Sequence, residues 1–204
     1  MPFEIWIQIV LICSLGAMSP GPSLALVVGN TVSGGRQHGV MTGVGHGVGI
    51  LFYASLVVAG LGVLISTSPQ LFLLLQWGGA LFLGYLGFRY LFPGEAVVEG
   101  VEAVEANQGG LFAQGFLIAF LNPKIAAFFF ALFSQFLRPE AGWGEKSVMA
   151  LTAGVIDAAW YVTVATILAG SRLLGFLHQH QKRFDQSVGV LLILLAVGVV
   201  LRVP

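Results

Sequence analysis

Two charged residues lie deep inside apolar segments of this sequence, where they could bind a charged ligand. Lys124 follows a proline in the stretch LNPKIAAFFF, and Asp157 lies within LTAGVIDAAWYVTVA. A lysine at the centre of a bilayer costs roughly 2.5–3.5 kcal/mol, so such residues usually face a pathway or another charge. A cation and a carboxylate in one cavity would bind the two ends of a zwitterion. The alternatives are a structural salt bridge between the two residues, or a Lys124 side chain that extends to a membrane interface.

Aromatic side chains share the predicted helix face of Asp157. Trp160 and Tyr161 follow it by three and four residues, which places them one turn further along the same face. An aromatic pair beside a carboxylate suits an ammonium group, both by charge and by cation–π contact. Tyr53 is a further candidate for the lining of a cavity. A protonatable Asp157 is also a candidate for coupling transport to protons.

Two helix-breaking motifs interrupt the apolar segments. The first is Ser19-Pro20-Gly21-Pro22, and the second is Asn122-Pro123-Lys124. Proline removes a backbone donor, and in lipid the freed polar groups need partners or a water-filled cavity. Breaks in corresponding helices of two halves are typical of a transporter binding site, although a single proline more often makes a simple kink. We expect the helix that starts after each break to present free N–H groups to a carboxylate.

The composition is that of an integral membrane protein. Of the 204 residues, 57% are hydrophobic and only 9% are charged, whereas a soluble domain has about 25% charged residues. A membrane-spanning helix needs about 20 mostly apolar residues. We therefore predict an all-α protein with six transmembrane helices, of which the first and fourth are broken at the proline motifs. The predicted spans are 4–29, 39–65, 70–91, 111–136, 147–171 and 186–203.

The segment 92–110 divides this single transmembrane domain into two halves of three helices, 1–91 and 111–204. It contains four Glu residues and no Lys or Arg, which is typical of a solvated linker. The stretches 40–53 and 148–161 align without gaps as a weak internal repeat, for which chance is the competing explanation. Three helices per half would bring the second half into the membrane from the opposite side, as an inverted repeat.

The orientation in the membrane is predicted from Lys and Arg, because acidic residues contribute little to it. Five of these residues lie in or next to the links between helices 1 and 2, 3 and 4, and 5 and 6, with Arg89 at the end of the third predicted span counted among them, and three lie on the opposite side. This difference favours both termini on the outer side. A chain with five true spans, which hydropathy also permits, would place its termini on opposite sides.

The predicted second helix is rich in glycine and contains His46. Small residues every four positions allow helix backbones to approach closely, so we predict that these glycines serve packing. His46 lies among them and is a candidate proton relay, with a structural role as the alternative. The glycines form two series with this spacing: Gly39, Gly43 and Gly47, and then Gly45 and Gly49.

The sequence argues against several other classes of protein. The net charge is zero, so no basic surface indicates nucleic-acid binding. The motifs HExxH and GxSxG and the Walker loop are missing, so we expect neither an enzyme nor a cofactor. His178 and His180 lack a further clustered ligand, so no metal site is expected. The single cysteine, Cys13, lies in an apolar run that indicates packing. A non-transporting membrane scaffold or assembly subunit is the alternative to a transporter.

Taken together, the motifs resemble the lysine exporter family, LysE/RhtB. The resemblance rests on MSPGPSLALVVGN, SGGRQHG, the glycine-rich second helix, GGALFLGYLGFRYL and GFLIAFLNPKIAAFFF, and it covers nearly the whole chain. It implies a bacterial inner-membrane permease that exports amino acids or related small metabolites, generally by using the proton motive force. The family motif positions that it carries over are Pro20, Gly21, Pro22, Asn122, Pro123 and Lys124.

The residues and the resemblance together predict an exporter that works by alternating access. The substrate carboxylate would lie at a half-helix N-terminus or at Lys124, and its ammonium group would lie near Asp157 and the aromatic residues. The expected partners are an amino-acid-like small molecule, protons and the lipid bilayer, and a homodimer is left open. The sequence does not fix which amino acid is exported or which ion drives its export.

Overall fold

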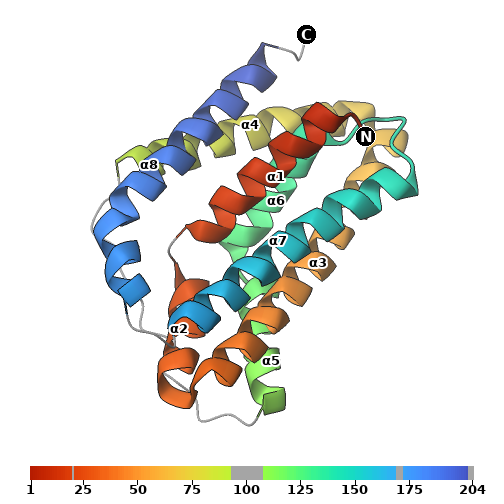
Figure 1. Ribbon diagram of the computed structural model, residues 1–204. Coiled ribbons are helices and arrows are strands. Elements are labelled where there is room, and N and C mark those ends of the chain that lie inside the picture. Colours follow the sequence, from red (N-terminus) through yellow and green to blue (C-terminus); the bar gives the residue numbers. More distant parts are fainter. Residues whose placement is uncertain (20, 93–107, 169–171, 202–204) are drawn as a thin grey trace.

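A computed structural model describes the chain except for residues 20, 93–107, 169–171 and 202–204. The described residues form helices and no strands, which confirms the all-α prediction (Figure 1). Residues 93–107 of the predicted linker 92–110 lie outside the described residues, and its last three residues already belong to the next helix. The helices are α1 (Phe3–Met18), α2 (Pro22–Gly34), α3 (Arg36–Thr67), α4 (Pro69–Leu91), α5 (Gln108–Phe120), α6 (Pro123–Phe136), α7 (Trp143–Leu168) and α8 (Arg172–Val200).

Among the described helices, three are long and apolar enough to cross a membrane: α3, α4 and α7. Five spans result if α1 with α2, bent by 59°, and α5 with α6, bent by 56°, each count as one. The apolar part of α8, Gln186–Gly198, is shorter than the helices that qualify as spans. The helical, multi-span architecture is therefore confirmed, whereas the sixth span and the inverted arrangement of the halves stay predictions.

Proline chemistry explains both breaks. Pro22 is the first residue of α2, and Pro123 is the first residue of α6. At that position the missing N–H would have had no partner within the helix, and the fixed φ angle suits a helix start. Each proline therefore begins a new helix in a new direction. The chain bends at these points, which lie inside what hydropathy alone predicts to be single spans.

The helix α3 lies side by side with α7 and packs against α5 on another face (Figure 1). A Cβ atom at Gly43 would lie 2.9 Å from the Cβ of Tyr161 in α7. One at Gly49 would lie 2.8 Å from the backbone oxygen of Phe116 in α5. Real Cβ atoms do not approach so closely, so the glycines permit this packing, as predicted. The first series faces α7 and the second faces α5: Gly39, Gly43 and Gly47, then Gly45 and Gly49.

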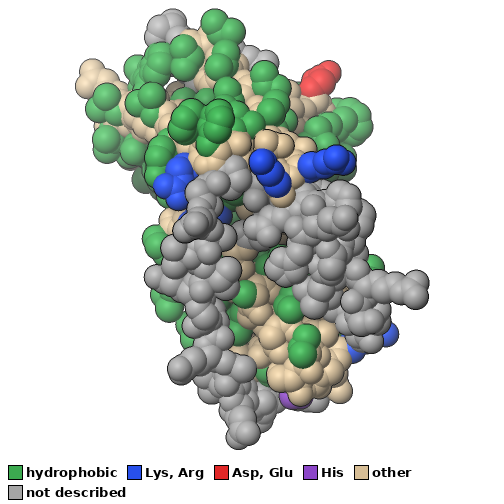
Figure 2. Space-filling view, turned by 90° about the vertical axis from the view of Figure 1, so that its left-hand side faces the viewer, with side chains coloured by type: hydrophobic (Ala, Val, Ile, Leu, Met, Phe, Trp, Pro, Cys, Tyr) green, Lys and Arg blue, Asp and Glu red, His purple; other side chains and the backbone are tan. Residues whose placement is uncertain are grey.

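Large hydrophobic side chains cover the outer faces of the long helices. In the view of Figure 2, the upper part of the molecule is mainly hydrophobic, and Lys and Arg side chains gather in a band below it. A surface of this kind is suited to contact with lipid, because exposing so many apolar side chains to water would be costly. Exposed examples are Phe52, Leu56 and Val63 of α3, Leu74, Leu81 and Phe88 of α4, and Leu151 and Val155 of α7.

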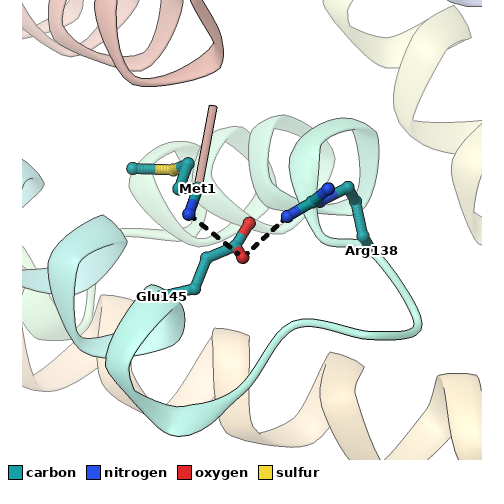
Figure 3. A network of polar contacts seen from close by, with 3 residues as sticks. All are labelled: Met1, Arg138 and Glu145. Carbon is teal, nitrogen blue, oxygen red and sulfur yellow. Dashed lines mark hydrogen bonds and ion pairs between the residues drawn. The ribbon is translucent and has the colours of Figure 1, made fainter. Parts of the chain in front are cut away.

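A charged network joins the start of the chain to the first turn of α7 and to the link that precedes it (Figure 3). The guanidinium of Arg138 donates to Oε2 of Glu145 at 2.9 Å, and the α-amino group of Met1 lies 3.5 Å from the same oxygen. Glu145 precedes Asp157 by twelve residues of α7, about 18 Å along the helix axis. The network is thus distinct from the charges in the middle of α7.

Candidate functional site

A cavity of about 90 Å³ lies where the two helix breaks meet. Residues from both halves of the chain line it, including Gly21 and Pro22 at the first break and Asn122 and Lys124 at the second. One water molecule needs roughly 10–15 Å³ of such space. The cavity can therefore hold several waters or a small ligand, with polar groups from different helices around it.

The carboxylate of this cavity is paired with a histidine. Nδ1 of His46 lies 2.6 Å from Oδ2 of Asp157, and the two residues are only 1% and 6% exposed. An ionised carboxylate can only accept, so in the neutral ring Nδ1 donates and Nε2 keeps the lone pair. The edge of the Tyr161 ring packs against His46, with 4.6 Å between ring centroids. We call His46 and Asp157 the dyad.

Glycine packing positions the dyad. Gly47 follows His46 in α3 and lies against Ala158, which follows Asp157 in α7, closely enough that a Cβ atom would not fit. Because the two backbones touch at this level, the side chains of the preceding residues can reach each other. The glycine spacing that predicts close packing therefore also explains how a histidine and a carboxylate come together far from either helix end.

Lys124 has a different partner from the one that the sequence offered. Its Nζ lies 5.0 Å from the centroid of the Tyr90 ring, a cation–π contact. The hydroxyl of Ser19 donates to the hydroxyl of Tyr90 at 2.7 Å. Among the described residues no salt bridge joins Lys124 to Asp157. That alternative is wrong, because His46 occupies the carboxylate and Lys124 extends from the start of α6 toward α4.

The two breaks differ in how they satisfy the new helix. At the second break, Oδ1 of Asn122 accepts from the N–H groups of Lys124 at 2.9 Å and Ile125 at 3.4 Å. The expectation of free N–H groups is therefore wrong for α6, because its own cap takes them. At the first break, Gly21 provides no side-chain cap for α2. The first turn of α2, with its backbone N–H groups, lies beside the cavity, and Ser23 of this turn lines it.

Most, but not all, of the predicted site residues line this cavity. Pro123 starts α6 without lining it, and Pro20 lies outside the described residues. Trp160 packs instead near Val27 and Ala165, so it does not share the site of Asp157. Tyr53 lines a separate, more open apolar groove between α3, α4 and α6. The predicted residues that line the cavity are Gly21, Pro22, His46, Asn122, Lys124, Asp157 and Tyr161.

Four polar residues of the lining were not predicted as site residues. Ser19 and Ser23 flank the first break, so hydroxyls beside a proline motif were an available signal. Tyr90 lies near the end of α4, next to Arg89, where the sequence resembles an ordinary membrane interface. Cys13 packs in the core as predicted, and it also lines the cavity.

A second buried polar cluster lies one helical turn from the dyad. Nδ2 of Asn30 donates to Oγ1 of Thr42 at 2.9 Å and to Oε1 of Gln114 at 3.1 Å. Thr42 precedes His46 by one turn of α3. The cluster joins α2, α3 and α5, so it links the second half-helix of one break to the first half-helix of the other.

The described residues contain no group of three His, Cys, Asp or Glu side chains that could hold a metal ion. The arrangement instead offers a cation, a carboxylate and an uncapped helix start around one small cavity. A carboxylate group suits the first and third of these, and an ammonium group suits the second. The geometry therefore matches a small zwitterion.

Comparison with known proteins gives a consistent result. The family model described as LysE type translocator matches residues 14–202. The threonine efflux protein of Escherichia coli (strain K12) is 29% identical over 92% of this chain and 93% of that protein. The homoserine/homoserine lactone efflux protein of Salmonella typhimurium is 29% identical over 82% of each chain. An uncharacterized membrane protein of Vibrio cholerae is 29% identical over 78% of each. No solved structure gives a significant match.

Proposed function

Because the chain belongs to the LysE type translocator family, we propose that it exports an amino acid or a related small metabolite across the bacterial inner membrane. Relatives that cover most of the chain carry the names of threonine and homoserine efflux proteins, which supports amino-acid export. The observation that carries the proposal is the cavity at the meeting point of the two breaks, with charge of both signs in its lining.

The substrate would lie across this cavity as a zwitterion. Its ammonium group would face the carboxylate of Asp157, beside the ring of Tyr161, where charge and cation–π attraction act together. Its carboxylate would face the uncapped start of α2 or the ammonium group of Lys124. Two oppositely charged ends held by separate helices would align the substrate, and they would favour a small amino acid over a singly charged metabolite.

Transport would proceed by alternating access. The bends of 59° and 56° at the two breaks are the points where half-helices can tilt, and the cavity lies between them. In our proposal the halves form an inverted repeat with six spans and both termini outside. The basic band in Figure 2 would then follow the headgroup region at the boundary of the apolar zone.

Protons would supply the driving force, with the dyad as the carrier. Histidine changes charge in the physiological range more readily than any other side chain, and this one is bonded to a buried carboxylate. Titratable residues inside a membrane usually mark proton or substrate pathways. The proton gradient, directed into the cell, would then drive the amino acid out.

The test is export from proteoliposomes loaded with a panel of labelled amino acids that includes threonine and homoserine, with a proton gradient imposed. We expect wild-type protein to export at least one of them, and Asp157→Asn to lower that rate at least about tenfold, because it removes the ammonium partner. Glu140→Gln, at an exposed carboxylate outside the cavity, is the matched control and should export normally. A well-folded wild type that exports none of the panel would contradict the proposal and favour a non-transporting scaffold.

A further inference from the structure

One atom of the dyad has no partner. Nε2 of His46 is buried and makes no hydrogen bond within the described part of the chain. The residue lines the cavity and is 1% exposed. A polar atom buried in the interior of a membrane protein is costly to leave unpaired, and such atoms in native structures call for an explanation. A proton or a ligand group is the explanation that fits a cavity-lining histidine.

The bond to Asp157 decides what this atom can bind. With the carboxylate ionised, Nδ1 donates to it, and Nε2 of the neutral ring offers a lone pair. A lone pair accepts a hydrogen bond from the N–H of an ammonium group. It also accepts a proton from water, after which Nε2 becomes a donor and can no longer accept from an amine. The same atom therefore accommodates either occupant, but not both.

The net charge of the dyad also makes a proton and an ammonium group compete. The dyad with a neutral ring has a net charge of −1, which attracts an ammonium group, and the dyad with a protonated ring has a net charge of zero. Low effective dielectric in a buried site makes this difference larger than it would be in water. Substrate affinity therefore depends on the protonation of His46, even where the amine contacts Asp157 rather than Nε2 itself.

No other pair among the described residues of the lining could change the charge of the cavity in the way that the dyad does. The titratable or charged groups around His46 are Asp157 and Tyr161 of α7, Cys13 of α1, Tyr90 of α4 and Lys124 of α6. Lys124 contacts Tyr90 rather than the dyad. The sides formed by α2, α5 and α8 present uncharged residues such as Ser23, Gly115 and Val188. Asp157 is the one carboxylate in the described lining, so its pairing with His46 sets the negative charge of the cavity.

We propose that a proton and the ammonium group of the substrate compete for His46 Nε2, so that the dyad is the site of exchange. This inference rests on the proposed export function and adds the atom at which coupling occurs. On the outer side a proton moves from hydronium to the Nε2 lone pair, and the amine leaves with its own protons. On the inner side the ring returns the proton to water, and the next substrate binds. One proton enters for each zwitterion that leaves.

The direct test measures protons released when substrate binds. The probe is the amino acid that wild-type vesicles export fastest in the panel above, added to purified protein in weakly buffered nanodiscs with a pH indicator. We expect release of up to about one proton per protein, and an affinity that falls as the pH is lowered, by at most about tenfold per pH unit. The N-acetyl derivative of the probe lacks the ammonium group and should release none.

Variants test whether the proton release and the pH dependence of affinity come from His46. His46→Gln should bind the probe with an affinity that no longer depends on pH, and it should release no proton. Asp157→Asn should also abolish the release. The matched control is His38→Gln, at a histidine in the first turn of α3 and outside the cavity lining, and it should keep the wild-type pH dependence.

The two proposals fail in different ways. Export by wild-type protein without proton release on binding would overturn the competition and leave the export function standing. Proton release that persists in His46→Gln would also overturn it, because another group would then be the carrier. If none of the panel is exported, the function and the competition fail together. The wild-type measurement alone decides the matter if His46→Gln does not fold.

Discussion

The two helix breaks bend the chain by similar angles, yet they are built from different chemistry. At α5–α6 the side chain of Asn122 caps the new helix, so the first N–H groups of α6 are already bonded. What this break contributes to the cavity is the side-chain cation of Lys124. At α1–α2 the cap position is Gly21, so this break contributes backbone N–H groups and nearby hydroxyls. Similar geometry in two halves thus does not imply equivalent roles, and each break can be converted toward the other by a single substitution.

The largest effect is expected from giving the first break the cap of the second. Gly21 has an extended backbone, with φ 180°, and a Cβ built there meets nothing within 4 Å, so Gly21→Asn should fit. Its side chain would take the N–H groups that we assign to the substrate carboxylate. A charge-assisted hydrogen bond is worth about 1.5–3 kcal/mol, so substrate affinity should fall about ten- to a hundredfold in a binding titration.

The control for this change is Gly21→Ala, which adds a Cβ atom but no cap. Its affinity should stay close to that of wild type. The unfolding free energy of Gly21→Asn should change by only a few tenths of a kcal/mol, roughly, because glycine is itself tolerated at the cap position. Unchanged affinity in Gly21→Asn would show that the start of α2 does not bind the carboxylate.

A smaller effect is expected from removing the cap of the second break. Asn122→Ala leaves the N–H groups of Lys124 and Ile125 without their partner. Loss of an N-cap costs about 0.5–2 kcal/mol of unfolding free energy, which thermal or denaturant unfolding in detergent will detect. Asn122→Ser keeps a capping oxygen and should retain most of the stability. If both variants unfold like wild type, the cap contributes nothing to stability and the two breaks are energetically alike.

The smallest effect is expected at Lys124. The residue is exposed and contacts the face of Tyr90, and a cation–π contact at an exposed site is worth about 0.5–1 kcal/mol. Because an exposed ion pair is worth at most about 1 kcal/mol, losing the pairing of Lys124 with the substrate carboxylate in Lys124→Met should weaken substrate binding by no more than roughly fivefold. Lys182→Met, at an exposed lysine outside the cavity, should bind like wild type. A loss larger than that in Gly21→Asn would make Lys124, and not α2, the main carboxylate partner.

The sequence predicted the parts of this fold that depend on local chemistry. Proline at the start of α2 and of α6, and the four-residue spacing of glycines in α3, each act within a few residues of where they lie. The cap on α6 is local as well: Asn followed by Pro is a typical helix start. The sequence could therefore have shown that these N–H groups are already bonded.

The partner of Asp157 could not be predicted in the same way. The sequence offered Lys124 because it is the cation that lies deepest in an apolar segment. The pairing with His46 instead depends on which face of α3 meets α7, and at which level along both helices. That register is set by contacts between segments more than 100 residues apart. Likewise, the contact of Lys124 with Tyr90 depends on where α4 ends in space.

The packing of α3 has a consequence for biosynthesis. Its two glycine faces fit α7 and α5, which follow α3 in the chain and are therefore synthesised after it. Until then His46 lacks Asp157, Asn30 lacks Gln114, and α3 lacks the close backbones of α5 and α7. Polar groups of α2 and α3 therefore have no partners until the second half of the chain packs against them. A chain severed between the halves should assemble only where both pieces are made together.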